Sequence, residues 1–375
     1  MAIQTAPNVQ TPLPQAAISG QQQGRIPFRR ATYERGQLMD GDTVTPGASQ
    51  QILQHNVIGD GYMYAIIDRV VANASGNAAT VAYAEDAPWS FFQRTQLSDV
   101  SGDLINLSGY ELYLSNLLQG QYAVFLPDST AHSALFVLTS GAGGTGGSYA
   151  FSVRYPVALN HRDLVGIAAN QSQTIKYTLT ETVAPSANIY TTAPTTVPQA
   201  AITRAYVNYA VPNTTSATGV PQDVIPPSWG VIHRLSSATL DVPAGGSVIR
   251  HNLRQVGQTI RGLVLIFRSN GSRATAETNN PTNIQMIAGS ATIFNLDWAT
   301  LKEQAFRRFG FDMPNGVLPL DWIHDFRERA GDEVGDDYLH TRDLTSLYLN
   351  ITYPTGFGST NNSLTAITDE LLNVA

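Results

Sequence analysis

A nine-residue pattern occurs twice in this chain of 375 residues, and it is the feature that most limits the possible folds. Residues 104–112 read LINLSGYEL, and residues 293–301 read IFNLDWATL, 189 positions later. The flanking segments 43–56 and 240–252 also resemble each other. A repeat of this period leaves about 150 residues for each copy, which is the size of an ordinary domain. The repeat therefore predicts two domains of similar design.

Each copy of the pattern predicts the start of a short helix. Ser108 and Glu111 have the spacing of a capping box, in which the hydroxyl accepts from a free backbone N–H and the carboxylate reaches back to the cap. Asp297 is the matching N-cap of the second helix, and Gly310 is its C-terminal stop. Gly120 supplies the C-terminal stop of the first helix.

The rest of the chain predicts strands. Short runs rich in β-branched and aromatic residues alternate with Gly, Pro, Asn and Asp, at the spacing of β-sandwiches and barrels. These runs occur in both halves, at residues 62–71, 122–126, 134–139, 149–157 and 174–180, and again at 202–211, 231–235, 247–252, 260–268, 316–320 and 346–353. The predicted fold is all-β: two consecutive jelly rolls, each an eight-stranded β-sandwich with one short inserted helix.

Composition shifts place the domain boundaries. Three prolines and few large apolar residues in segment 183–200 predict an extended linker, and the spacing of Leu364, Ile367 and Leu371 predicts a short amphipathic helix near the C-terminus. The predicted organisation is an N-terminal arm (1–35), jelly roll 1 (36–182), a Pro/Thr-rich linker (183–200), jelly roll 2 (201–353) and a C-terminal tail with that helix (354–375).

Charge is scarce, and its scarcity has consequences for function. Only 14% of residues are charged, against about 25% in an average soluble domain. The net charge of -7 argues against specific nucleic-acid binding, which needs a concentrated cationic surface. Cysteine is absent, so disulfides and Cys-ligated metals are excluded. A surface with so little repelling charge predicts that much of it is covered by neighbouring molecules.

Motifs that carry chemistry are weak. Residues 141–146 (GAGGTG) match a dinucleotide-binding pattern, but an alternating strand follows where a phosphate-binding helix should begin, so a loop between strands is favoured. The acid-rich segment 321–343 could bind a hard cation such as calcium, although it lacks the EF-hand register; a solvated loop or an ion-pair patch between subunits is favoured. No nucleophile elbow, phosphate loop or zinc-protease motif occurs. We therefore predict no enzymatic activity and no cofactor.

Three segments resemble a known family. Residues 260–273 (IRGLVLIFRSNGSR), 155–166 (YPVALNHRDLVG) and 315–322 (NGVLPLDW) are similar to strands and turns of the double jelly-roll major capsid proteins of tailless, membrane-containing bacterial viruses, the tectivirus-like proteins. The resemblance implies a capsid subunit that forms pseudo-hexameric homotrimers and tiles an icosahedral virion shell over an internal membrane. The implied partners are other copies of the chain and the penton, minor capsid and membrane proteins of the virion, with assembly in the host cytoplasm.

The N-terminal arm carries four arginines: Arg25, Arg29, Arg30 and Arg35. Because the N-terminal segment lies on the inner face of the shell in the resembled family, these arginines are candidates for contact with anionic lipid head groups, each adding about 1 kcal/mol near such a surface. The alternative is a disordered tail with incidental charge.

A second interpretation remains open at this stage. A two-domain β-sandwich that binds glycans or a receptor would need exposed aromatic side chains in its loops. Trp89 and Trp229 lie near proline-rich turns and are the candidates. A β-rich hydrolase is a third possibility, but no paired acid site can be located for it.

Overall fold

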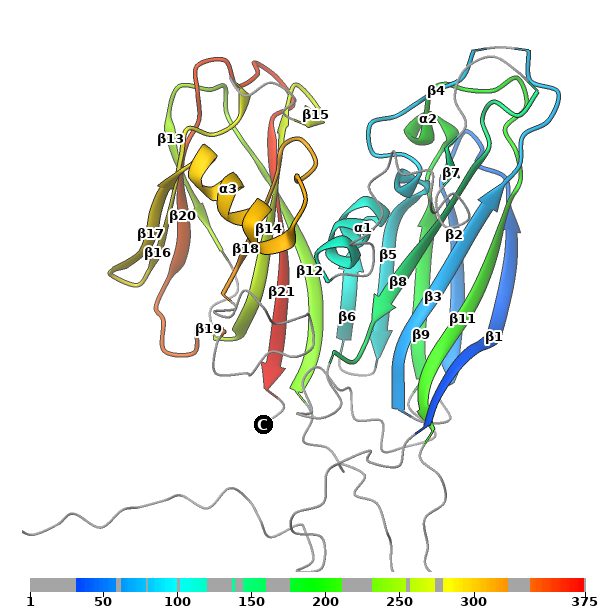
Figure 1. Ribbon diagram of the computed structural model, residues 1–375, viewed down its shortest axis with the longest axis horizontal. Coiled ribbons are helices and arrows are strands. Elements are labelled where there is room, and N and C mark those ends of the chain that lie inside the picture. The colour runs from blue at the N-terminus through cyan, green and yellow to red at the C-terminus, as the bar shows by residue number, and fades with distance from the viewer. Residues whose placement is uncertain are drawn as a thin grey trace, which may run out of the picture.

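Two β-sandwiches stand side by side in the computed structural model (Figure 1). The structure describes residues 32–58, 62–78, 80–99, 102–119, 137–138, 144–159, 176–210, 231–253, 257–273, 279–322 and 338–373.

The first sandwich consists of two facing layers. One layer has the strand order β1 (Thr32–Val44), β11 (Ala200–Ala210), β3 (Tyr62–Ala72), β8 (Tyr149–Pro156), with β7 (Val137–Leu138) beside β8. The other layer has the order β6 (Gly102–Leu107), β5 (Phe92–Asp99), β9 (Lys176–Val183), β2 (Gln51–Ile58). Strands β4 (Ala82–Tyr83) and β10 (Tyr190–Thr192) form a separate pair. Inward-facing side chains such as Leu97, Phe151 and Leu179 fill one hydrophobic core between the layers.

The second sandwich is built in the same way. One layer has the order β12 (Val231–Asp241), β21 (Ser363–Asn373), β14 (Thr259–Ser269), β18 (Val317–Asp321), and β15 (Ser272–Arg273) and β19 (Leu339–His340) also pair with β14. The facing layer has the order β17 (Ala291–Asp297), β16 (Asn283–Ala288), β20 (Leu347–Thr352), β13 (Val248–Asn252). Leu265, Met286 and Leu349 are among the residues of its core.

The duplication extends to strand order and register. Strands at the same place in the two sandwiches correspond to each other. In the first layer the order β1, β11, β3, β8 matches the order β12, β21, β14, β18. In the facing layer the order β6, β5, β9, β2 matches the order β17, β16, β20, β13. Leu97 lies opposite Ile105 in the first sandwich, and Met286 lies opposite Phe294 in the second, so the offset of 189 residues holds across two strands. Each sandwich is therefore a copy of one design.

A helix directly follows the corresponding strand in each copy. In α1 (Gly109–Leu118), the Ser108 hydroxyl accepts from the Glu111 N–H at 3.3 Å, and the Ser108 N–H donates to the Glu111 carboxylate at 2.8 Å. In α3 (Trp298–Phe309), the Asp297 carboxylate accepts from the Thr300 N–H at 2.7 Å, which lowers the pKa of Asp297. Gly310 follows with φ 78°, the left-handed conformation that glycine adopts without strain.

The predicted boundary between the domains is wrong. Segment 183–200 is no linker, because it contains α2 (Ser186–Ile189) and β10, and both Ile189 and Tyr190 are buried in the first core. Strand β11, expected to begin the second domain, instead lies between β1 and β3. The first sandwich therefore continues to residue 210. The prolines of the segment suit its extended backbone, but they do not make it independent of the core.

The predicted C-terminal helix is also wrong. Residues 363–373 form β21, which lies in the sheet between β12 and β14. Leu364 and Ala366 face the second core, whereas Ile367 faces the first sandwich. A strand covered on both faces carries apolar residues at odd and even positions, so its spacing imitates that of a helix. The predicted arm is likewise too long, because β1 begins at Thr32 and contains Arg35.

Candidate functional site

The two sandwiches are joined through their sheets. Strand β6 of the first pairs in parallel with β12 of the second, with Ile105 opposite Leu235 and Asn106 opposite Ser236. This pairing links one layer of each sandwich into a continuous ten-stranded sheet. The junction between the copies is thus part of the fold, and it is the candidate functional site of a protein whose sequence favours assembly over catalysis.

The hydrophobic part of the junction comes from alternate residues of β14. Leu263, Leu265 and Phe267 face the second core, whereas Val264 and Ile266 face the other way and belong to the hydrophobic cluster of the first sandwich. Other residues of the second sandwich in that cluster are Leu235, Val317 and Ile367. Burying each such side chain stabilises the junction by roughly 1.5–3 kcal/mol relative to exposure. Residues 263–267 of β14 are therefore apolar at every position because both faces of the strand are covered.

Helix α1 lies between the two sandwiches (Figure 1). Leu112 lies on one side of the helix and Leu114 and Leu117 lie on the opposite side, and all three are buried. An amphipathic helix on a surface leaves one side in water, whereas α1 is buried on both sides. Its residues Tyr110 and Glu111 contact Arg273 and Ser237 of the second sandwich. In α3, by contrast, Glu303 and Arg307 are exposed and pair with each other at 2.5 Å.

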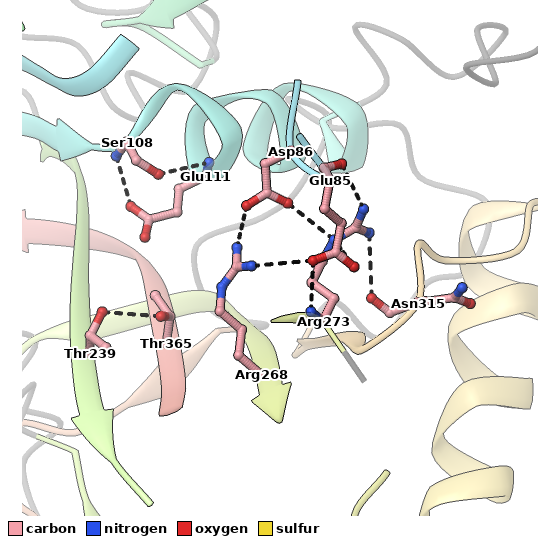
Figure 2. A network of polar contacts seen from close by, with 9 residues as sticks. All are labelled: Glu85, Asp86, Ser108, Glu111, Thr239, Arg268, Arg273, Asn315 and Thr365. Carbon is pink, nitrogen blue, oxygen red and sulfur yellow. Dashed lines mark hydrogen bonds and ion pairs between the residues drawn. The ribbon is translucent and has the colours of Figure 1, made fainter. Parts of the chain in front are cut away.

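Charged side chains cross the junction beside α1 (Figure 2). Glu85 and Asp86 of the first sandwich meet Arg268 and Arg273 of the second. The shortest pairs join Arg268 Nη2 to Asp86 Oδ2 at 2.5 Å and Arg273 Nε to Asp86 Oδ1 at 3.1 Å. The Arg273 guanidinium also lies 5.0 Å from the ring centroid of Tyr110. These partly buried contacts fix the orientation of the second sandwich against α1.

The cap of α1 is itself part of the junction. Oε2 of Glu111 accepts from the Ser108 N–H and also from the hydroxyl of Ser237 in β12, both at 2.8 Å. Sequence reasoning assigned Glu111 only to the helix cap, and no signal in the sequence could have identified Ser237 as its partner. One carboxylate thus stabilises the start of α1 and holds the second sandwich.

A second polar cluster lies at the other end of the junction. Asp369 accepts from His233 Nε2 at 2.9 Å and from Arg261 Nη1 at 2.7 Å. Burial alone would raise the pKa of Asp369, but Arg261 and His233 more than offset it and lower that pKa to about 2. His233 Nδ1 lies 3.4 Å from the carbonyl oxygen of Pro156 in the first sandwich. The ionised carboxylate therefore positions a histidine that reaches across the junction.

The first core holds a buried ionic cluster of its own. Arg204 lies between Asp68, at 2.8 Å, and Glu181, at 2.5 Å, and the Tyr155 hydroxyl donates to Glu181. Burial and the neighbouring Asp68 raise the pKa of Glu181 well above its usual range, while Arg204 opposes this shift. Arg204, Asp68 and Glu181 have no exposed surface, so the cluster joins the two layers and offers no access to a substrate.

Other predicted site residues lie elsewhere or outside the described residues. Arg25, Arg29 and Arg30 precede the described part of the chain, and Arg35 lies in β1. Of the glycine-rich segment, residues 144–146 belong to a turn just before β8. Most of the acid-rich segment, residues 323–337, lies outside the described residues. In the part of the chain that is described, no group of three His, Asp or Glu side chains is arranged to hold a metal ion, and no helix is long and apolar enough to cross a membrane.

One of the two tryptophans named as candidates for glycan binding is buried. Trp89 is 6% exposed and stacks on Tyr113 of α1 with ring centroids 3.5 Å apart. The expectation that Trp89 is an exposed loop aromatic is therefore wrong, because it supports α1 from within the first core. Trp229 lies outside the described residues.

Comparison with solved structures identifies the architecture. The crystal structure of the STIV (Sulfolobus Turreted Icosahedral Virus) major capsid protein is 13% identical, with 90% of this chain and 97% of that chain covered and a TM-score of 0.58. The PBCV-1 virus capsid gives 12% identity, coverage of 91% and 95%, and a TM-score of 0.58. The chain has the double jelly-roll fold. The Faustovirus major capsid protein shares it at 8% identity, coverage of 92% and 91%, and a TM-score of 0.54.

The double jelly roll confirms the fold class predicted from the repeat and the strand pattern. The likeness to double jelly-roll major capsid proteins also agrees with the family resemblance of the sequence. No protein-family model matches the sequence, and comparison with curated proteins gives no match. The likeness is therefore one of fold, and it includes both sandwiches, because it covers at least nine tenths of this chain in each comparison above.

Proposed function

We propose that this protein is a major capsid subunit of an icosahedral virion. The observation that carries the proposal is the extent of the structural likeness: two sandwiches in the same order match capsid proteins over more than 90% of those proteins' own length. A fold alone does not define a function, but the described residues form no metal cluster that would compete with a role in assembly. The tightly joined sandwiches give such a subunit a fixed shape.

The proposed mechanism is geometric. Three chains form a ring of six similar sandwiches, so a homotrimer has a nearly hexagonal outline and tiles a shell with other trimers. Head-to-tail contacts of this kind close into a ring when the rotation between neighbours permits it. The low content of charged residues, 14%, suits a subunit that meets neighbours on several sides.

Further partners follow from this role. We propose that the arm with Arg25, Arg29 and Arg30 lies on the inner face of the shell and contacts anionic lipid of an internal membrane or neighbouring subunits. Penton, minor capsid and membrane proteins of the virion are the other proposed partners, with assembly in the host cytoplasm.

Electron microscopy of the purified protein and of the particles that it forms tests the proposal. We expect capsomers of hexagonal outline, arranged in closed shells when the other virion proteins are co-expressed. Binding on a glycan array, without capsomers or shells, would contradict the proposal and favour a receptor-binding virion protein.

A further inference from the structure

Two exposed hydrophobic side chains occupy repeat positions that are buried in the first copy. Four large hydrophobic side chains are exposed among the described residues: Ile52, Val248, Ile293 and Phe306. Ile293 is 37% exposed, whereas its counterpart Leu104 is 3% exposed. Phe306 is 47% exposed, whereas its counterpart Leu117 is 4% exposed. The same positions are thus apolar in both copies but covered in only one.

The covering of the first copy explains this difference. Leu104 lies in β6 and Leu117 in α1, the two elements that meet the second sandwich. Ile293 lies in β17 and Phe306 in α3, and Figure 1 shows β17 at the edge of the second sandwich that is far from the first, with α3 across the front of the second sandwich. Ile293 and Phe306 therefore lack the neighbour that their counterparts have.

The strand edges show the same asymmetry. β6 pairs with β5 on one side and with β12 on the other. Its counterpart β17 pairs only with β16 among the described strands, and β1, the counterpart of β12, pairs only with β11. An edge strand offers a row of backbone N–H and C=O groups to another chain. Among the described strands, β17 and β1 thus have open edges at the places where β6 and β12 pair with each other.

A matching surface lies on the first sandwich. In β14 and β21, Val264 and Ile367 lie opposite each other and are buried under the first sandwich. The corresponding residues of β3 and β11, Ile67 and Ala205, also lie opposite each other but are only partly buried. Ile67 and Val264 are each the sixth residue of an eleven-residue strand, which supports the correspondence.

We propose that β17 and α3 of one chain bind β1 and the outer face of the β3 and β11 layer of a second copy of the chain. The new contact repeats between chains the junction that already exists within each chain, with Ile293 and Phe306 in the places of Leu104 and Leu117. Strands β17 and β1 lie at opposite ends of the molecule in Figure 1, so one chain cannot join them by itself. This inference rests on the proposed trimer and names its interface.

Light scattering coupled to size-exclusion chromatography tests the interface with the variant Ile293→Lys/Phe306→Lys. Both side chains are exposed within the chain, so the variant should keep the circular dichroism spectrum of the parent. We expect its molar mass to fall from that of three chains to that of one, 40.4 kDa. A matched control is Ile52→Lys/Val248→Lys, which changes the other two exposed hydrophobic residues, on β2 and β13, and should leave the trimer intact.

The outcomes separate the interface from the proposed function. If Ile293→Lys/Phe306→Lys remains a trimer as stable as the parent, the interface is wrong, while the trimer itself stands. If the control variant dissociates and the interface variant does not, the contact lies at β2 and β13 instead. If the parent protein is a monomer, the proposed trimer fails first.

Chemical cross-linking gives an independent readout, because the chain contains no cysteine. In the variant Ile67→Cys/Phe306→Cys, a short bismaleimide should link neighbouring chains into covalent dimers and trimers. The control Ile52→Cys/Phe306→Cys should give much less of these products. Equal linking of both variants, or preferential linking of the control, would overturn the proposed contact.

Discussion

The guanidinium of Arg204 in β11 lies 2.5 Å from the carboxylate of Glu181 in β9, so this buried ion pair connects the two layers of the first sandwich. Arg204 also pairs with Asp68, its direct cross-strand neighbour. In the second sandwich the corresponding cross-strand pair is Ala366 and Leu265. The same interior position is thus filled by charged side chains in the first sandwich and by apolar side chains in the second.

We expect Arg204→Met to destabilise the protein by about 3–5 kcal/mol, because it leaves Asp68 and Glu181 buried without a cation. Denaturant unfolding at fixed protein concentration measures the change. A loss below 1 kcal/mol would show that the two carboxyl groups are protonated and need no partner.

Replacing the whole cluster should cost less than breaking it. The variant Asp68→Leu/Glu181→Ile/Arg204→Ala carries residues of the second sandwich, and buried ion pairs exchanged for well-packed apolar side chains are often neutral or stabilising. We expect its free energy of unfolding to exceed that of Arg204→Met. A triple variant less stable than the single one would mean that the first core cannot close around apolar side chains.

Glu370 should make stability depend on pH. Burial raises its pKa to about 7, with Arg234 opposing and Asp369 adding to the shift. The folded protein therefore holds a proton that the unfolded chain releases near pH 4.5, and this contribution to stability is lost as pH rises toward and through 7, with a slope of at most about 1.4 kcal/mol per pH unit.

The variant Glu370→Gln should remove this slope, as followed by thermal unfolding between pH 5 and 8. Glu303→Gln is the control, because Glu303 is exposed on α3 and pairs only at the surface. An unchanged slope in Glu370→Gln would assign the pH dependence to another group.

Gly109→Ala should destabilise the protein although alanine favours helices. A Cβ at this first residue of α1 would lie 2.2 Å from the carbonyl oxygen of Trp89, which belongs to backbone and cannot move aside easily. We expect a loss of about 1–3 kcal/mol in chemical denaturation, as for other overpacked sites. At Gly47 the nearest atom to an added Cβ is 3.9 Å away, so Gly47→Ala should change stability by less than about 0.5 kcal/mol. Similar effects at both positions would contradict the close approach of α1.

The ion pair between Asp86 and Arg268 should couple the two sandwiches. A double-mutant cycle with Asp86→Asn and Arg268→Met is expected to give a coupling energy of about 1 kcal/mol, because both side chains are about four fifths buried. The exposed pair Glu303 and Arg307 on α3 should give about 0.3–0.5 kcal/mol. A coupling at the junction no larger than that of the exposed pair would mean that apolar contacts alone orient the sandwiches.

The sequence predicts features that depend on local spacing. Ser108, Glu111 and Asp297 lie next to the helices that they cap, so their roles follow from positions three residues apart. The duplication is visible because the repeated segment keeps its order of apolar residues.

Features that depend on distant neighbours could not be predicted. Ile367 is apolar because the first sandwich covers it, and that covering made β21 resemble a helix. The partnership of Glu111 with Ser237 joins residues 126 positions apart, and nothing in either local segment indicates it. The sequence predicts the wrong sandwich for strand β11, because the residues of a strand do not indicate which strands it will pair with.

The molar mass of the protein in solution tests the central claim most directly. Light scattering at micromolar concentration should give about 121 kDa, the mass of three chains of 40.4 kDa. A single species of about 40 kDa would contradict a capsid subunit that closes into a ring of six sandwiches.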